Sequence, residues 1–130
     1  MNLGKDTDMR KYLKVFEGFI MWEYLAGVFD MRGFLQVNLV KDSKGRTKFN
    51  VFFNFTERDL EIFKCLSNWL NRNGIKNSIY RIRRVKGKKE FQLYITNRRG
   101  SISFLEHILY FSLRKEEIVK SLNLIKPKSL

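Results

Sequence analysis

Residues 24–34, YLAGVFDMRGF, decide how the chain folds. Through and before this stretch there is no proline and apolar residues recur at helical spacing, so we predict a helix from Met9 to Asp30. Gly33 follows that helix, where a residue in the left-handed conformation is expected to end it. From Phe34 to Val40, apolar and polar residues alternate, which is typical of a half-buried strand. The stretch therefore predicts a helix that leads directly into a strand.

The rest of the chain repeats one pattern, a hairpin followed by a helix. A strand is predicted from Lys48 to Phe55, after a turn at residues 42–45, and Thr56 is expected to cap a helix that Gly74 stops. Strands at 79–85 and 91–95, a helix opening at 100–101 and a last helix at 114–125 follow. We predict an α+β fold in the order αββαββα, a four-stranded antiparallel saddle sheet with helices on one face. One domain, 1–130, is expected, with a flexible start at residues 1–10.

The charge balance indicates a polyanionic partner. The chain has 26 Lys and Arg residues against 13 Asp and Glu residues, a formal net charge of +13. Nucleic acid is the leading candidate, because Lys and Arg that neutralise phosphates supply affinity for any base sequence. The alternative is a basic surface without such a partner, as in some ribosomal or thermophilic proteins.

Cysteine use and hydropathy predict an intracellular protein without a membrane partner. The single cysteine, Cys65, excludes an intramolecular disulfide, and its apolar helical surroundings predict a buried structural thiol. The polar start of the chain is not a signal peptide, and the longest apolar stretch is too short to cross a bilayer. We expect a location in the cytoplasm, nucleoid-associated when bound to DNA, or in an organelle. A zinc site is not expected, because His107 has no second His or Cys at ligand spacing.

One face of the predicted sheet has no helix to cover it, and its side chains are mostly amide-bearing or positively charged. Asn and Gln suit adenine edges and Arg suits guanine edges, both reached from the major groove. A basic cluster at 81–89 on the second hairpin is a candidate for phosphate contacts. The alternative is an ordinary solvated sheet face. The residues predicted to contact DNA are Gln36, Asn38, Lys41, Arg46, Lys48, Asn50, Asn54, Arg81, Arg83 and Gln92.

The opening stretch resembles the LAGLIDADG signature of homing endonucleases and related maturases, through Leu25, Ala26, Gly27, Asp30 and Gly33. The predicted hairpin and helix order agrees with the domain of that family. The resemblance implies that two motif helices pack together, and a chain with one motif would then form a homodimer on a pseudo-palindromic DNA site. Leu25, Ala26, Gly27 and Asp30 are the implied interface residues. Small side chains at Ala26 and Gly27 would let the two helices approach closely.

At one position the sequence departs from the family. The family has a metal-binding acidic residue just before the final glycine of the motif, and here that residue is Arg32, a permanent cation that cannot bind a cation. Glu57 and Lys115 resemble the other positions of the family's catalytic pocket. The resemblance thus implies a degenerate site and no cofactor, with Mg²⁺ required only if the chain cuts DNA. Our hypothesis is that Arg32 pairs with a phosphate in place of the metal, and the alternative is a drifted residue.

Three functions follow from these observations. The first is a sequence-specific double-stranded DNA-binding protein of the homing endonuclease type, unable to cleave, acting as a repressor or a relic of a mobile element from an intron or intein. The second is an active endonuclease that makes double-strand breaks with Mg²⁺, using a ligand set such as Asp30 with Glu57. The third is an RNA-binding intron maturase, since the family includes such proteins.

Overall fold

The computed structural model describes residues 6–41, 47–85 and 87–125, and it describes the side chains of residues 17–37, 49–82 and 87–124. The predicted turn at residues 42–45 lies outside these ranges. The elements, in chain order, are α1 (Asp6–Arg32), β1 (Gly33–Lys41), β2 (Thr47–Thr56), the 3₁₀ turn η2 (Glu57–Asp59), α2 (Leu60–Arg72), β3 (Asn77–Val85), β4 (Lys88–Ile95), α3 (Arg98–Ile108) and α4 (Lys115–Ile125). The predicted flexible start therefore overlaps α1, whose helix begins at Asp6.

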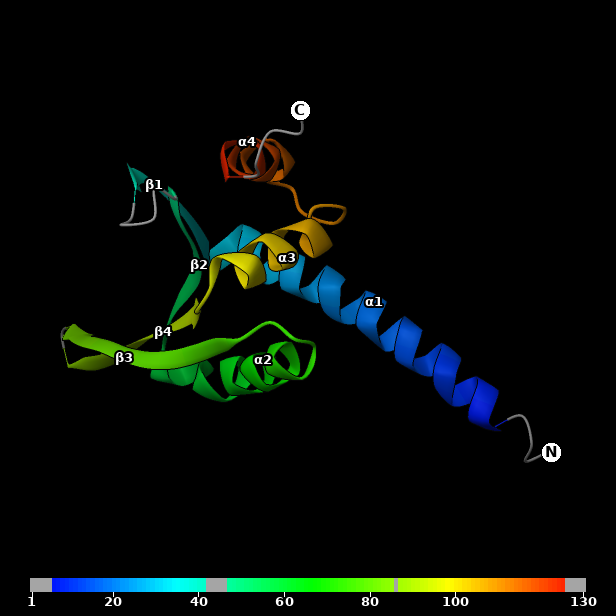
Figure 1. Cartoon of the computed structure of the whole chain (residues 1–130). Helices are drawn as coiled ribbons and strands as arrows, with labels where there is room; N and C mark the ends of the chain where they lie inside the picture. The colour runs from blue at the N-terminus through cyan, green and yellow to red at the C-terminus, as the bar shows by residue number, and fades with distance from the viewer. Residues whose placement is uncertain (1–5, 42–46, 86, 126–130) are drawn as a thin grey trace.

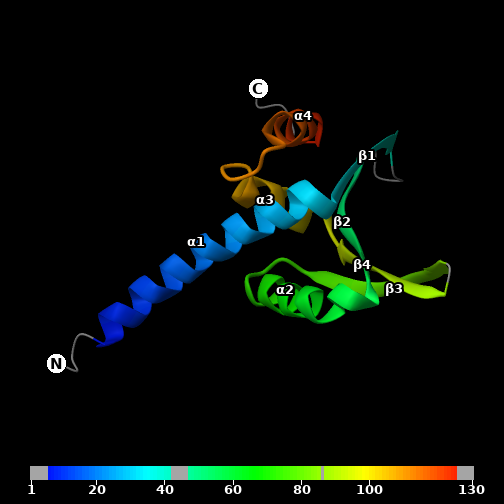
Figure 2. The ribbon, with the colours of Figure 1, turned by 180° about the vertical axis from the view of Figure 1, so that it is seen from behind.

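The four strands form one antiparallel sheet in the order β1-β2-β4-β3. In Figure 1, α1, α2 and α3 lie on one side of this sheet, and its other side is left without a helix. The view from behind in Figure 2 shows the same arrangement, with α1 projecting from the rest of the chain toward the N-terminus. The predicted α+β fold is confirmed, and we call the helix-free side of the sheet the open face.

The core fills the space between the sheet and the helices. Apolar side chains of β2, such as Phe53, are buried against the last turns of α1 and the middle of α3. The Phe53 ring centroid lies 6.3 Å from that of Phe29 and 5.8 Å from that of Phe104, and both pairs meet edge to face. Such aromatic contacts add to the free energy gained by apolar burial. The end of α1 is therefore part of the core and is fixed by it.

Two glycines have different roles at helix ends. Gly74 has φ +82° and follows α2, so the predicted stop at this residue is confirmed. Gly33, expected in the left-handed conformation, is not among the residues with positive φ. A Cβ at Gly33 would instead collide with the Phe29 side chain and lie 2.8 Å from the Phe29 carbonyl oxygen. The chain requires glycine there because α1 and β1 meet too closely for a side chain.

Three local predictions are corrected by the structure. Thr56 makes no side-chain cap, and a 3₁₀ turn precedes α2. α3 begins at Arg98, and its cap is Asn97, whose Oδ1 accepts a hydrogen bond from the Gly100 amide at 2.5 Å. Cys65 is exposed, because it lies off the helix stripe that α2 buries.

Candidate nucleic-acid interface

The end of α1 is tied to the segment between α3 and α4. The carboxylate of Asp30 accepts hydrogen bonds from Ser112 Oγ at 2.5 Å and from the Leu113 amide at 2.8 Å. Arg114 Nη1 donates to the carbonyl oxygens of Phe29 and Gly33 at 2.9 and 2.7 Å. The last carbonyl groups of a helix have no partner within the helix, so Arg114 satisfies groups that would otherwise depend on water.

Arg114 is itself fixed by contacts with Phe29 and Glu117. Its guanidinium carbon lies 4.3 Å from the centroid of the Phe29 ring. Its Nε and Nη2 donate to the two carboxylate oxygens of Glu117 at 2.8 and 2.7 Å, a bidentate pair. These hydrogen bonds lower the pKa of Glu117 and raise the pKa of Arg114. Lys115, the predicted basic residue, is the exposed first residue of α4, so the cation that contacts the end of α1 is Arg114.

Arg32 forms an ion pair with Asp59 through Nη1 and Oδ2. The Arg32 side chain is 49% exposed and the Asp59 side chain 19%, so water reaches the pair mainly from the arginine side. Glu57, the predicted pocket residue, instead has Oε1 4.0 Å from Lys89 Nζ. The 3₁₀ turn presents Asp59 to the end of α1, and the sequence alone did not single out this residue.

Arg32 and Asp59 line a hollow of about 490 Å³ that also reaches Phe34 of β1 and Asn54 of β2. The ion pair therefore borders the open face of the sheet. Among the described residues, no group of three or more His, Cys, Asp and Glu is placed to hold a metal ion. The carboxylate of Asp59, which is paired with Arg32, is compensated by that guanidinium group.

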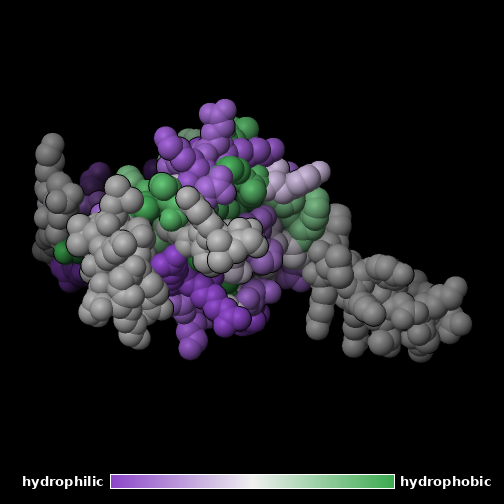
Figure 3. Space-filling view, turned by 45° about the horizontal axis from the view of Figure 1, so that its top comes forward, coloured by the Kyte–Doolittle hydropathy of each residue, from purple (hydrophilic) through white to green (hydrophobic). Residues whose placement is uncertain are grey.

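Four of the predicted DNA-contact residues share the open face. Gln36 pairs with Asn50 across β1 and β2, and Asn54 pairs with Gln92 across β2 and β4. Gln92 Nε2 donates to Asn54 Oδ1 at 3.1 Å. Amides from three neighbouring strands therefore lie on the open face as two pairs, one on each side of Phe52. The space-filling view in Figure 3, in which the top of the Figure 1 view comes forward, shows mostly hydrophilic side chains with hydrophobic ones among them on that side of the molecule.

A row of aromatic side chains crosses the same face. Phe34 pairs with Phe52, and Phe52 pairs with Tyr94, on three adjacent strands. The Tyr94 hydroxyl donates to Asn50 Oδ1 at 2.5 Å. Burial, and then the nearby Tyr80, raise the pKa of Tyr94.

The register of β3 differs from the predicted alternation. Arg81 pairs with Phe91, which packs against the core, so Arg81 lies on the helix-covered side and not on the open face. A shift between residues 81 and 83 then places Arg83 opposite Glu90. Tyr80, opposite Gln92 and 52% exposed, lies on the open face, although it was not among the predicted contact residues; its alternation with Ile79, which packs against the core, is the signal that indicates it.

The other predicted DNA contacts lie where side chains are not described. Asn38 pairs with Lys48, and Lys41 pairs with Thr47, at the far end of the first hairpin. Arg46 lies outside the described residues. These residues and Arg83 remain predictions.

The residues that α1 exposes differ from the interface residues that the resemblance implied. Leu25 and Ala26 are 1% exposed and belong to the core of one chain. Gly27 is exposed, and a Cβ built on it would meet no atom within 4 Å. Ile20, Tyr24 and Met31 flank Gly27 at helical spacing and are 47%, 48% and 84% exposed. Together these four residues form a stripe on α1, which we call the outer stripe, beside a hollow of about 380 Å³ that extends to α2.

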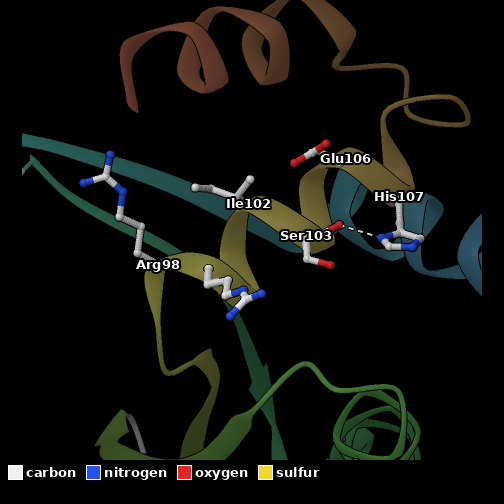
Figure 4. Close-up of a pocket in the computed structure, with 6 residues that line it drawn as sticks. Arg98, Ile102, Ser103, Glu106 and His107 are labelled. Atoms are coloured by element: carbon white, nitrogen blue, oxygen red, sulfur yellow. Dashed lines mark hydrogen bonds between the residues drawn. The ribbon is translucent and has the colours of Figure 1, made fainter. Parts of the chain in front are cut away.

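A further hollow, of about 460 Å³, lies along α3 (Figure 4) and is lined by Arg98, Ile102, Ser103, Glu106 and His107, among others. His107 Nδ1 lies 2.7 Å from the Ser103 carbonyl oxygen. Its ring stacks on Trp22 with centroids 4.3 Å apart. These contacts give the single histidine a structural role, and α3 lies on the side of the sheet opposite the open face (Figure 1).

Comparison with known proteins supports the fold. No family model matches the sequence, and no curated protein matches it. Among solved structures, the homing endonuclease I-CvuI in complex with its target in the presence of calcium has a TM-score of 0.63 and 17% identity, covering 84% of this chain and 68% of that chain. A second I-CvuI structure, with the I-CreI target and magnesium and with the DNA not cleaved, has the same values. An archaeal intron-encoded homing endonuclease, I-Vdi141I, complexed with DNA, has a TM-score of 0.57 and 15% identity, covering 81% of this chain and 66% of that chain.

The chain therefore has the fold of the LAGLIDADG homing endonucleases, at an identity where the likeness concerns the fold alone. Its order is αββαββαα, because α4 follows α3. Within the described residues, no helix is both long enough and apolar enough to cross a membrane.

Proposed function

We propose that the chain is a sequence-specific double-stranded DNA-binding protein that acts as a homodimer and does not cleave its target. The observation that carries this proposal is the open face, where two pairs of amide side chains from β1, β2 and β4 flank an aromatic row without a covering helix. Amides in such an array offer paired donors and acceptors to adenine edges in the major groove. The net charge of +13 supplies the affinity for phosphates that holds the protein on the duplex.

The outer stripe is the proposed dimer contact. Apolar Ile20, Tyr24 and Met31 surround Gly27, where the backbone is uncovered and a second helix can approach it closely. Two copies related by a two-fold axis would each present the same stripe to the other. Their sheets would then follow one duplex for about two helical turns, or roughly 20 base pairs.

The ion pair between Arg32 and Asp59 is the reason to propose loss of cleavage. Mg²⁺ prefers carboxylate oxygens, and at the end of α1 the neighbouring carboxylate is neutralised by a guanidinium group. The other two carboxylates considered are engaged: Asp30 accepts from the Ser112 and Leu113 donors, and Glu57 faces Lys89. These residues do not fit a metal site. Arg32 would instead meet a phosphate by exchanging or sharing its contact with Asp59.

A selection experiment tests the proposal. Purified protein is incubated with a library of random duplexes, bound duplexes are recovered over several rounds, and the enriched sequence is then used in binding titrations with and without chelator. We expect an enriched, pseudo-palindromic site, binding by two copies, equal affinity with chelator, and no cutting with Mg²⁺ or Mn²⁺. Loss of affinity in chelator would contradict the metal-independent contact, and double-strand breaks would replace the proposal with an active endonuclease.

A further inference from the structure

One member of the aromatic row on the open face, Phe34, has about half of its surface exposed to solvent. Phe34 is 48% exposed, whereas Phe52 is half-buried. The two rings are nearly parallel, with centroids 5.2 Å apart and an interplanar angle of 11°. An offset stack of this kind leaves the outer ring with one face covered and one face available.

Phe34 is that outer ring. It lies on β1, and β1 is an edge strand of the described sheet, so the stack Phe52–Phe34 ends at the sheet edge. A planar group placed against the outer face of Phe34 would continue the stack by one layer. Phe34 also borders the hollow of about 490 Å³ that extends toward Asn54 of β2, and this volume lies within the range of roughly 300–1,000 Å³ that small-molecule sites occupy.

The surroundings of Phe34 favour a nucleobase as that planar group. Asn54 borders the hollow and carries two N–H donors, which suit the polar edge of a base. Arg32 and Arg58 border it as well, together with the carboxylates of Asp59, which pairs with Arg32, and Glu90, so a phosphate attached to the base would compete with Asp59 for Arg32 and could also meet Arg58. Aromatic faces next to basic and amide groups are the means by which proteins bind bases that are not stacked in a duplex.

We propose that Phe34, backed by Phe52, is a stacking site for an unpaired DNA base. The protein then binds a duplex that has an unpaired base at this point more tightly than a fully paired duplex of the same length. The inference rests on the proposed function, because it requires DNA on the open face. It adds to that function a preference for locally unpaired DNA, which hydrogen bonds to base edges alone do not produce.

The test compares two DNA probes and three variants. The probes are the selected duplex and the same duplex with one extra adenine bulged at its centre. Phe34→Leu removes the aromatic face and keeps an apolar side chain, and Phe34→Trp keeps an aromatic face. Tyr110→Leu is the matched control, since Tyr110 is an exposed aromatic residue, 77% exposed, outside the open face. Thermal unfolding of each variant identifies any loss of fold.

We expect the wild-type protein to bind the bulged duplex roughly tenfold more tightly than the paired duplex, as the strength of base–aromatic stacking suggests. Phe34→Leu should abolish this preference, and because Phe34 lies on the open face, the readout is the ratio of the bulged-duplex to the paired-duplex affinity measured for each variant. Phe34→Trp and Tyr110→Leu should retain the preference. Equal binding of the two probes by the wild-type protein, or a preference that survives in Phe34→Leu, would overturn the stacking site.

The outcome separates this inference from the proposed function. If the paired duplex is bound sequence-specifically but Phe34 has no effect on the preference, only the stacking site fails. If neither DNA probe is bound, the proposed function fails too. Repeating the titration with bulged RNA decides the partner: binding of the RNA alone, dependent on Phe34, would overturn the assignment to DNA.

Discussion

The two sides of the end of α1 differ in how firmly they are held. On the inner side, Arg114 and Asp30 make hydrogen bonds to the backbone and side chains of three segments, and Phe29 is fully buried. On the outer side, Gly27 is uncovered and Arg32 makes one ion pair with half of its side chain exposed. The difference indicates that the inner side holds the fold together, whereas the outer side is available to partners.

The largest expected effect is on the inner side. Arg114→Ala should lower the free energy of unfolding by roughly 2–4 kcal/mol, because it leaves the carbonyl groups of Phe29 and Gly33 without their donor. Urea unfolding measures this change. Arg114→Lys keeps the charge without the planar fork and should recover only part of the loss. A loss below about 0.5 kcal/mol in Arg114→Ala, the range of ordinary surface substitutions, would mean that this side of the helix end is not fixed as described.

The inner and outer sides of the end of α1 each contain a glycine, so the substitution of glycine by alanine can be compared between them. Gly33→Ala should destabilise the fold by roughly 1–3 kcal/mol, because its Cβ collides with Phe29 on the inner side. Thermal and urea unfolding measure the loss. An unchanged stability would show that Phe29 moves aside without cost.

Gly27→Ala on the outer side should have the opposite sign. With open space around the new Cβ, the monomer should gain up to about 1 kcal/mol from higher helix propensity. The proposed dimer should weaken, because the added methyl group separates the two helices. Analytical ultracentrifugation checks the second effect, and tighter association in Gly27→Ala would exclude the outer stripe as the contact.

Acid titration examines the contact between Arg114 and Glu117. The hydrogen bonds from Arg114 lower the pKa of Glu117 below its ordinary value of 4.5. The stabilisation from this contact is therefore complete above that value and is lost as the pH falls through the lowered pKa. Glu117→Gln should show a smaller loss of stability below pH 4.5 than the wild type. Glu116→Gln, which removes a neighbouring charge, is the control, and an equal change in both variants would argue against a specific contact.

The smallest expected change in stability is on the outer side, where the informative measurement is DNA binding. Asp59→Asn should change stability by less than about 1 kcal/mol, since half-exposed ion pairs contribute little. It frees the Arg32 charge, so the dependence of DNA affinity on salt should steepen by about one phosphate contact per subunit. Arg32→Gln should not steepen it. Identical salt dependence in the wild type and Asp59→Asn would place Arg32 away from the DNA.

The order of helices and strands could be predicted from the sequence because it depends on periodicity. Alternation in β2 and the helical spacing through Phe29 are local patterns, and the core confirms both. Gln36 and Asn50 lie on the open face, as predicted, because the register of the first hairpin is regular there. In β3, Arg81 alternates in register with Ile79 and so shares its helix-covered side, whereas the shift after Arg81 places Arg83 opposite Glu90, and such a shift leaves no reliable mark in a run of arginines.

Two of the predicted pocket residues lie one or two positions from the residues that make the contacts at the end of α1. Lys115 was selected where Arg114 makes the contacts, and Glu57 where Asp59 does, because both choices depended on where a helix or turn begins. Helix ends are the least certain part of a pattern, and side-chain direction changes by about 100° for each residue of a helix. Pairings such as Ser112 with Asp30, 82 positions apart, have no local signal in the sequence.

That last pairing has a consequence for the order of folding. The end of α1 is completed by residues 112–114, more than 80 positions later in the chain, so its contacts close a very long loop. Contacts of such separation form late, because much chain entropy must be lost before they stabilise anything. Substitutions of Arg114 should therefore accelerate unfolding and leave the refolding rate almost unchanged. The helix end that gives the protein its motif would be among the last parts of the molecule to become native.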